Sequence, residues 1–216
     1  MKIVSIIPIK MNNERLPGKN TKLLGKYPLL YYIQKTLLSV LEINERYVFC
    51  SDQKICDYLL PGIKYLNRSP ELDKSTSNFT QIFESFFQKI SADIYVYAHA
   101  TAPFVQKETI KECIQMVISQ KYDSSFCAVK IQDYLWSKGK PLNFDPKNLP
   151  RSQDLTPIYR ETSGVYVFTK EVFDLYHQRI GRNPFIKEVT FRESVDINTP
   201  QDFQLAEMVL KNKNLG

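Results

Sequence analysis

The order of apolar and polar positions along the chain predicts strands and helices that alternate. A β-branched apolar run at 2–9 is typical of a central parallel strand buried on both faces. A polar loop follows at 10–26. Apolar residues then recur at helical spacing over 28–41, with Pro28 in the first turn, where proline is favoured. The chain therefore begins as strand, long loop and helix.

The same alternation continues to the end of the chain. Further strands are expected at 46–50, 63–66, 93–98, 124–129, 164–168 and 185–191, and helices at 53–60, 79–90, 109–119, 170–178 and 199–210. Thr199 as N-cap with Pro200 after it is a strong start signal for the last helix. Strands that alternate with helices predict a doubly wound α/β domain with a mainly parallel sheet, whose ligands bind at the carboxyl ends of the strands.

One segment, 132–162, departs from this alternation. It contains Trp136, Gly139, four prolines and short polar runs. Long irregular segments of this kind usually lie outside the core. We expect a single domain over 1–216 with an arm or flap at 132–162.

Composition excludes several classes of protein. With 43% hydrophobic residues the chain is not disordered, and its longest apolar runs are far shorter than a membrane span. The N-terminus does not resemble a secretory signal, so a cytoplasmic protein is expected. The four cysteines form no CxxC pair and are expected to be buried free thiols, because two histidines do not complete a structural zinc site.

The charge balance favours an anionic partner. The chain has 29 Lys and Arg residues and 23 Asp and Glu residues, so its net charge is 29 − 23 = +6. A positive net charge fits a nucleotide, a nucleic acid or an acidic sugar as partner. The basic residues are scattered and are not interleaved with aromatic residues, so we expect no nucleic-acid binding.

The loop after the first strand is the first candidate for chemistry. Over 8–20 it carries the cations Lys10, Arg15 and Lys19 at the carboxyl end of a central strand, where an α/β sheet would hold a polyphosphate. It contains no Walker A motif. An ordinary solvated basic loop is the alternative interpretation.

Six motifs in register resemble one enzyme family. They are Ile6-Ile7-Pro8 with Pro17-Gly18-Lys19-Asn20, and then segments 48–52, 67–72, 98–103, 151–159 and 195–203. This pattern resembles the N-acylneuraminate (CMP-sialic acid) synthetase family, the cytidylyltransferases that activate acidic sugars. Segment 15–19 is similar to the related synthetases for 3-deoxy-manno-octulosonate (KDO). The resemblance covers essentially the whole chain.

The resemblance implies a Rossmann-like fold and a cytoplasmic enzyme of surface glycan biosynthesis. Its reaction would transfer CMP from CTP to a sugar hydroxyl with release of pyrophosphate, and it would require Mg²⁺. Positioning and neutralisation of charge carry the rate of such reactions. The arm would pair two subunits in a homodimer.

The resemblance also suggests roles for particular residues in nucleotide binding. Lys10 and Lys19 are assigned to the triphosphate as catalytic residues, and Arg15 is a candidate to add a contact because Lys10 stands where the family usually has arginine. The remaining expected nucleotide contacts are Pro8, Asn20, Arg68, His99 and Thr101.

Asp196 is the expected metal ligand. The family often has Asp-x-Asp there, two carboxylates on one edge of an extended segment, whereas this chain has Asn198 as the second residue. An amide oxygen can still ligate Mg²⁺ or hold its water. Alternatively, Asp196 only accepts hydrogen bonds from backbone donors ahead of the last helix.

The sugar site is expected near 151–164. Arg151, Gln153 and Tyr159 resemble the sugar-side loop of sialate-type synthetases, and Thr162 stands where the family has an asparagine of the sugar site. These residues favour a nonulosonic acid as acceptor, with pseudaminate, legionaminate or another acidic or phosphorylated acceptor open. A purely structural arm is the alternative.

Other departures leave the activity itself open. Met11-Asn12-Asn13-Glu14 replaces the family's Gly-Gly-Ser-Lys, so the loop lacks the glycines that allow close approach to phosphate, and Glu14 is expected to point away. Substitutions at Lys10, Asn198 and Thr162 keep two alternatives, a nucleotidyltransferase for another base or acceptor and a degenerate nucleotide-binding paralogue. Lys19 and Asp196 are retained, which argues against the second.

Overall fold

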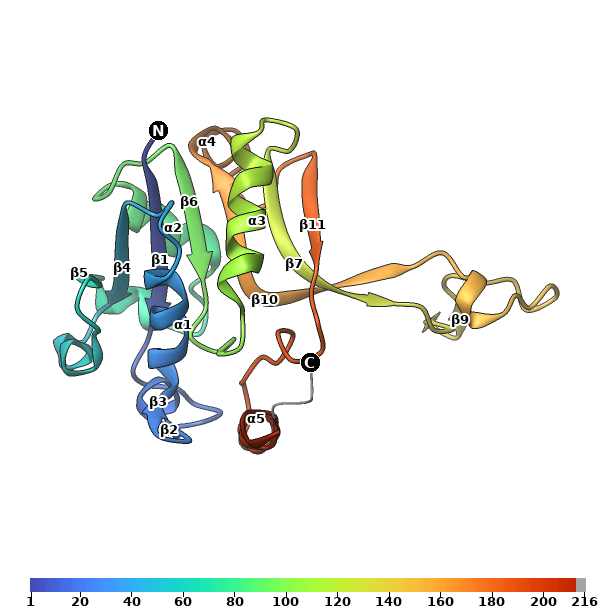
Figure 1. Ribbon diagram of the computed structural model, residues 1–216, viewed down its shortest axis with the longest axis horizontal. Coiled ribbons are helices and arrows are strands. Elements are labelled where there is room, and N and C mark those ends of the chain that lie inside the picture. The colour runs from blue at the N-terminus through green and yellow to red at the C-terminus, as the bar shows by residue number, and fades with distance from the viewer. Residues whose placement is uncertain (213–216) are drawn as a thin grey trace.

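A seven-stranded sheet forms the centre of the computed structural model, which describes residues 1–212 (Figure 1). The strand order is β11-β7-β10-β6-β1-β4-β5. Neighbouring strands are parallel, except that β10 runs antiparallel to both β6 and β7. The prediction of a mainly parallel sheet is confirmed. The strand bounds are β1 Ile3–Ile9, β4 Glu45–Cys50, β5 Lys64–Asn67, β6 Ile94–Ala98, β7 Ser124–Ile131, β10 Ile158–Thr169 and β11 Pro184–Glu188.

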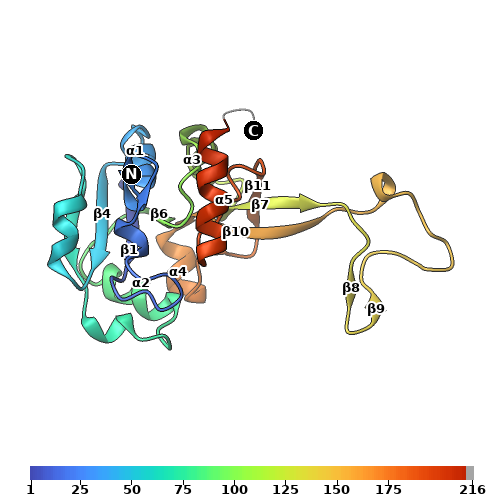
Figure 2. The same cartoon turned by 90° about the horizontal axis from the view of Figure 1, so that it is seen from below.

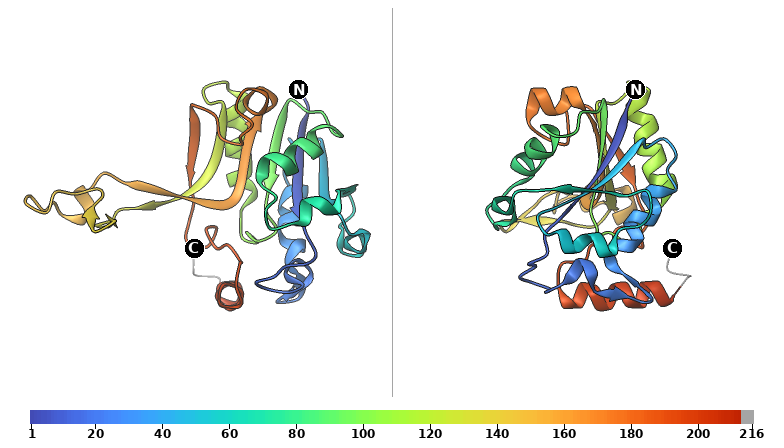
Figure 3. Two further views of the ribbon diagram at one scale, coloured as in Figure 1. Left: turned by 180° about the vertical axis from the view of Figure 1, so that it is seen from behind. Right: turned by 90° about the vertical axis from the view of Figure 1, so that its left-hand side faces the viewer.

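Helices cover both faces of this sheet, as expected for a doubly wound domain (Figure 3). α1 (Leu29–Leu38) and α3 (Lys107–Ile118) pack on one face, and α2 (Phe79–Phe87) and α4 (Lys170–Tyr176) pack on the other. β1 contributes to both layers, with Ile7 and Ile9 toward α1 and Ile6 toward the aromatic cluster under α2. This alternation follows from the two-residue period of a strand.

The last helix, α5 (Pro200–Lys211), packs beyond the end of β1 instead of on a sheet face. Its residue Phe203 is buried against Leu16 and Leu24 of the loop after β1. The short elements of that loop are η1 (Lys19–Thr21), β2 (Leu23–Leu24) and β3 (Tyr27–Pro28). The loop therefore lies between the sheet edge and α5.

Two expected elements differ in the structure. The helix expected at 53–60 is a 3-10 helix, η2 (Gln53–Tyr58), because Pro61-Gly62 leaves little room before β5 begins. The strand expected at 164–168 is the twelve-residue β10, which begins at Ile158. Its first half pairs with the end of β7, so that Ile158 lies opposite Ile131. Pairing with β7 therefore extends the strand into the segment expected to be irregular.

Residues 132–157 extend away from the sheet beyond the β7 and β10 ribbon (Figures 1 and 2). They form a small hairpin, β8 (Trp136–Ser137) and β9 (Lys140–Pro141), and later the 3-10 turn η4 (Ser152–Asp154). Lys138 and Gly139 between the two strands both have positive φ, 50° and 74°, as a two-residue hairpin turn requires. We call residues 132–157 the arm.

All four cysteines are free thiols, as expected. Cys50, Cys113 and Cys127 are buried, but Cys56 is only half-buried in η2, so the expectation that all four are buried was wrong for Cys56. Within residues 1–212 no helix has the length and the apolar character to cross a membrane.

Candidate active site

The candidate site lies at the edge of the sheet where β1, β4 and β6 end. Along the chain, the strand order moves from β1 to β4 and β5 on one side and then to β6 on the other side of β1. The reversal creates a crevice between the loops that follow β1 and β6, which is where open α/β sheets bind their ligands. Figure 2 shows the molecule from this edge, where α5 and the loop that follows β1 lie side by side.

A cavity of about 290 Å³ opens between the loop after β1 and the segment before α5. It brings together the three cations that the sequence singled out in the loop, Lys10, Arg15 and Lys19. A cavity with this charge suits a polyphosphate. Its other lining residues include Asn13, Glu14, Ser75 and Asn198.

The loop that carries the cations is held by its own polar contacts. Gly18 adopts a left-handed conformation with φ 65° at the start of η1, a conformation that glycine adopts without strain. Asn20 is buried, and its side-chain amide donates to the Lys10 carbonyl over 3.0 Å and to Asn13 over 3.5 Å. Asn20 therefore stabilises the loop around the cavity.

Lys19 is the most buried cation of the cavity, with 8% of its surface exposed. Its ammonium donates a hydrogen bond to the Ile197 carbonyl over 2.9 Å. Burial lowers the pKa of Lys19, and the nearby Asp196 carboxylate acts in the opposite direction. The charge is thus desolvated and close to a carboxylate, a setting in which it interacts strongly with a bound anion.

Asp196 and Asn198 lie together, as their spacing predicts. The Asn198 side-chain amide donates to Asp196 Oδ2 over 2.6 Å, and Asp196 Oδ1 is buried and has no hydrogen-bond partner within residues 1–212. The start of α5 is instead capped by Thr199 and Asp202, which form a reciprocal capping box. Asp196 is therefore not the cap of this helix.

The other loop residues hold this arrangement from the opposite side. Arg15 donates to Asn198 Oδ1 over 3.0 Å, and Lys10 donates to the Asp73 carbonyl over 3.4 Å. The expectation that Glu14 points away was wrong, because Glu14 lines the cavity. The loop from Lys10 to Arg15 curves around the cavity, so consecutive side chains face it.

The turn after β6 contacts the segment that carries Asp196. The Ile197 amide donates to the Thr101 carbonyl over 2.8 Å. His99, in the same turn, is half-buried, and its Nε2 atom is buried with no hydrogen-bond partner among residues 1–212. Burial, followed by the positive charge of Arg179, lowers the pKa of His99 to about 4. At neutral pH the ring is therefore uncharged.

Arg68 and Pro8 lie at the wall of the crevice, and Arg68 Nε is buried without a hydrogen-bond partner within residues 1–212. Arg68 is 2% exposed and forms an ion pair with Asp73, with its guanidinium 5.9 Å from the centre of the Phe49 ring. Pro8 lies within β1, opposite Phe49 of β4. Both residues support the walls of the crevice.

The residues expected to bind sugar do not join this site within one chain. Arg151 pairs with Asp154 over 2.7 Å on the arm, and Gln153 of the arm accepts a hydrogen bond through its backbone carbonyl from Gln132. Tyr159 stands 40% exposed near the start of β10, beside the arm. Figure 1 shows how far the arm extends from the loops that hold the cations.

Thr162 is also unavailable to a ligand. It is 4% exposed, and its hydroxyl donates to the Cys127 carbonyl over 3.0 Å. The β7 and β10 pairing shifts register between Glu161 and Tyr166, and this irregularity turns Thr162 into the sheet. Thr162, which the resemblance places at the sugar site, therefore donates its hydroxyl to the sheet in this structure.

Arg179 is a candidate residue that the sequence did not reveal. It follows α4, and its guanidinium lies 3.8 Å from the centre of the Tyr166 ring and donates to Glu161 over 3.1 Å. Its positive charge contributes to the lowered pKa of His99. No motif marks this position, so only the packing of α4 against the sheet could identify it.

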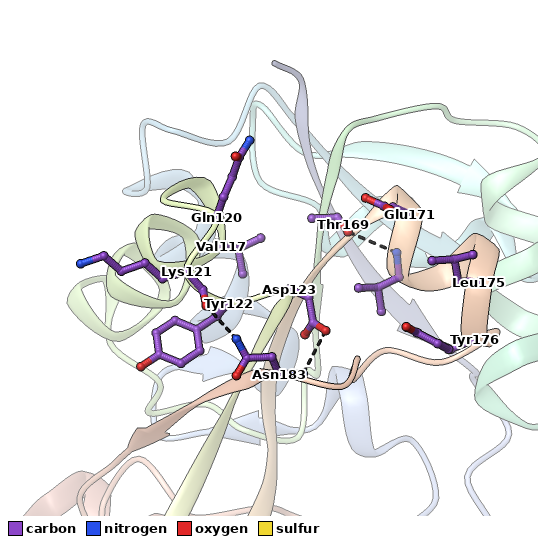
Figure 4. Close-up of a pocket in the computed structure, with 11 residues that line it drawn as sticks. Val117, Gln120, Lys121, Tyr122, Asp123, Thr169, Glu171, Leu175, Tyr176 and Asn183 are labelled. Carbon is purple, nitrogen blue, oxygen red and sulfur yellow. Dashed lines mark hydrogen bonds between the residues drawn. The ribbon is translucent and has the colours of Figure 1, made fainter.

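A larger cavity, of about 520 Å³, lies elsewhere (Figure 4). Its wall is formed by residues at the end of α3, in the loop before β7 and in α4, at the edge of the sheet where the parallel strands begin. Asp123 accepts hydrogen bonds there from the amides of Arg182 and Asn183. This carboxylate fixes the loop before β11, and we do not assign the cavity to the site.

Comparison with known proteins identifies the family. The model of the cytidylyltransferase family matches residues 4–215, nearly the whole chain. The chain belongs to this family.

Individual relatives span the chain at modest identity. A pseudaminic acid cytidylyltransferase of Campylobacter jejuni is 28% identical, covering 98% of this chain and 97% of its own. N-acylneuraminate cytidylyltransferase A of Danio rerio is 27% identical over 95% of this chain, which spans only half of that longer protein. A solved CMP:2-keto-3-deoxy-manno-octonic acid synthetase complexed with CTP has the same fold, with a TM-score of 0.74 at 17% identity, and 99% of this chain and all of that chain are covered.

Proposed function

We propose that this protein transfers CMP from CTP to the hydroxyl of an acidic sugar of the nonulosonic type and releases pyrophosphate. The family and its relatives, which include a pseudaminic acid cytidylyltransferase of similar length, support this activity. Surface glycan biosynthesis is the process in which such a product would be used. The observation that carries the proposal is the cavity where Lys10, Arg15 and Lys19 converge near Asp196.

In this proposal the cations bind the triphosphate. Attack on the α-phosphate builds negative charge on the departing pyrophosphate, and fixed cations stabilise that charge without reorganising. Lys19 supplies a desolvated ammonium, and Arg15 supplies the guanidinium that Lys10 lacks. The exposed Glu14 on the cavity wall opposes an anion, and the three nearby cations outweigh it.

Mg²⁺ is the proposed cofactor, and the residues fit it through one carboxylate. Asp196 Oδ1 is buried and unpartnered within residues 1–212, as a ligand oxygen awaiting a cation would be. No group of three His, Cys, Asp or Glu side chains that could hold a metal occurs in the described chain. Mg²⁺ typically binds through one or two carboxylates with substrate phosphates and water. Asp196 would hold the ion, which would neutralise phosphate charge. Asn198, whose amide donates to Asp196 Oδ2, would orient that carboxylate.

A homodimer formed through the arm is a further part of the proposal. The arm carries the exposed apolar side chains Trp136, Leu142 and Leu149, at 60%, 58% and 63% of their surface. Exposed apolar groups of this kind favour burial against another chain. The arm lies far from the cavity of its own chain. In such a dimer, a sugar bound at the cavity of the second subunit would be the one contacted by Arg151, Gln153 and Tyr159. Free thiols are typical of cytoplasmic proteins, which is where we expect the dimer to act.

Pyrophosphate release tests the activity. Each of the four ribonucleoside triphosphates is combined with Mg²⁺ and each of several acids, namely N-acetylneuraminate, pseudaminate, legionaminate and KDO. The proposal predicts release with CTP and at least one nonulosonic acid, and little with ATP, GTP or UTP. Release with CTP and KDO alone would reassign the acceptor, and release with another triphosphate would reassign the base.

A further inference from the structure

A hydrogen bond at the cavity joins the loop after β1 to the segment ahead of α5. Arg15 Nη2 donates to Asn198 Oδ1 over 3.0 Å, and both residues line the cavity. The Arg15 side chain is exposed, and a long exposed arginine samples many rotamers unless a partner restricts it. Asn198 is that partner, because the Arg15 side chain makes no other hydrogen bond within residues 1–212.

The amide of Asn198 bridges two groups whose roles cannot be exchanged. Its nitrogen donates to Asp196 Oδ2 over 2.6 Å, while its oxygen accepts from Arg15. An ionised carboxylate can only accept a hydrogen bond and a guanidinium can only donate one, so these partners determine which way the amide faces. A carboxylate at position 198 could accept from Arg15 but could not donate to Asp196. An asparagine therefore makes a bridge here that an aspartate could not.

The backbone that carries this amide is held on both sides. The Asn198 N–H donates to Asp202 Oδ2 over 2.9 Å, and Asp202 belongs to the capping box of α5. The preceding carbonyl, of Ile197, accepts from Lys19 over 2.9 Å. The acceptors for Arg15 and for Lys19 are thus consecutive residues of one fixed segment. Two cations of the cavity are held in place by the protein itself, which spares the cost of ordering them when an anion binds.

We propose that Asn198 is a positioning residue for the nucleotide, which holds Arg15 at the cavity so that the remaining donors of the guanidinium bind the triphosphate of CTP. This inference rests on the proposed function, because it takes the triphosphate as the ligand of the cavity. Asn198 uses one of the five N–H groups of the guanidinium and leaves the others for the ligand. Hydrogen bonds between a guanidinium and phosphate are charge-assisted, so a guanidinium that is already in place adds directly to the affinity for CTP.

A double-mutant cycle on CTP binding tests this role. CTP is the probe, EDTA is present so that no effect on a metal enters, and calorimetry measures the Kd. Arg15→Ala should weaken binding about tenfold, the lower end of what a hydrogen bond to a charged group contributes. Asn198→Ala should weaken it roughly two- to tenfold, which corresponds to the cost of ordering one long side chain. The double variant should bind CTP no more weakly than Arg15→Ala alone, because Asn198 acts only through Arg15.

Further variants separate positioning from a structural role. Asn198→Ser has a side chain too short to span both partners, so it should weaken CTP binding to the same extent as Asn198→Ala. Asn148→Ala removes an exposed asparagine of the arm, whose amide likewise donates to an aspartate, Asp145, over 3.3 Å. This control should keep the wild-type Kd for CTP. In turnover with Mg²⁺, Asn198→Ala should raise the KM for CTP and leave the KM for the acidic sugar within threefold.

The outcomes distinguish this inference from the proposed function. If the losses from Arg15→Ala and Asn198→Ala multiply in the double variant, or if Asn198→Ala binds CTP like the wild type, the inference is wrong while the proposed activity stands. A variant at 198 that melts at lower temperature and raises both KM values equally also overturns it. A wild type that binds CTP only when Mg²⁺ is present overturns the inference alone. A wild type that binds no CTP under either condition contradicts the proposed function as well.

Discussion

The ammonium group of Lys19 donates a hydrogen bond to the carbonyl oxygen of Ile197 over 2.9 Å, across 178 positions of the chain. The bond joins the loop after β1 to the segment that carries Asp196 and Asn198. It places a desolvated cation and a carboxylate at one end of the crevice. The same lysine therefore contributes to the fold and, in our proposal, to the reaction.

Replacing Lys19 should consequently affect both stability and catalysis. Lys19→Met keeps the aliphatic chain and removes the charge. Leaving the Ile197 carbonyl without a donor should cost about 1–3 kcal/mol, and the melting temperature should fall by about 2–4 °C for each kcal/mol. The value of kcat/KM should fall on the order of 10²-fold, as for loss of one electrostatic stabiliser of a transition state. Lys26→Met, at an exposed position of the same loop, serves as the matched control. Activity of Lys19→Met within threefold of wild type would mean that Lys19 is only structural.

The metal proposal predicts opposite effects for two neighbouring substitutions. Asn198→Asp replaces the 2.6 Å hydrogen bond to Asp196 with repulsion between carboxylates, so without Mg²⁺ the protein should melt at lower temperature. With Mg²⁺ and CTP it should gain more stability than wild type, and the half-maximal Mg²⁺ concentration should fall several-fold because a second anionic ligand is added.

Asp196→Asn should abolish the stabilisation by Mg²⁺ with CTP, because the carboxylate of this segment is lost. Thermal melts with and without Mg²⁺ measure both effects, and Asp174→Asn, on α4, controls for loss of a carboxylate. The metal assignment on this segment would be contradicted if Asn198→Asp had no effect and the Asp196→Asn variant responded to Mg²⁺ like the wild type.

The lowered pKa of the half-buried His99 predicts how stability depends on pH. The pKa of His99 is about 4 in the folded protein, against an ordinary value near 6.5 in the unfolded chain. Between these values the unfolded chain binds a proton that the folded protein does not, so stability falls as the pH decreases from 6.5 to 4, by up to about 3 kcal/mol.

Denaturant unfolding at several pH values measures this slope. His99→Gln should be less sensitive to pH over that window, whereas His177→Asn, at an exposed left-handed position that suits asparagine, should keep the wild-type slope. Identical slopes for wild type and His99→Gln would show that His99 is protonated equally in both states.

The proposed dimer is tested on the arm. Trp136→Glu combined with Leu149→Glu puts charges on exposed apolar positions. Sedimentation should change from a dimer to a monomer, and Leu41→Glu, at an 86% exposed position outside the arm, should remain dimeric. A wild type that sediments as a monomer at micromolar concentration would contradict the role of the arm.

Local signals in the sequence predicted most of the fold. The β-branched run at 2–9 became β1, and Thr199 with Pro200 became the start of α5, because a buried strand and a helix cap are determined by a few adjacent residues. The antiparallel pairing of β10 was not predicted, since the direction of a strand depends on the path of the arm between β7 and β10.

The candidate site was predictable where its residues belong to one motif. Lys10, Arg15 and Lys19, which the sequence singled out in one loop, line one cavity in the structure. The hydrogen bond from the Thr162 hydroxyl to the Cys127 carbonyl lies beside a register shift in the sheet, which no sequence pattern reveals. Arg179 was missed because its relation to Tyr166 arises only when α4 packs on the sheet.

The most direct test of the proposed activity is identification of the product. The protein is incubated with CTP, Mg²⁺ and one nonulosonic acid at a time, and the mixture is analysed by mass spectrometry. We predict an ion with the mass of the CMP ester of that acid, formed only when CTP and the acid are both present and lost in Lys19→Met. Absence of a CMP ester with every acid tested, from a protein that CTP stabilises against melting, would contradict the proposed transfer.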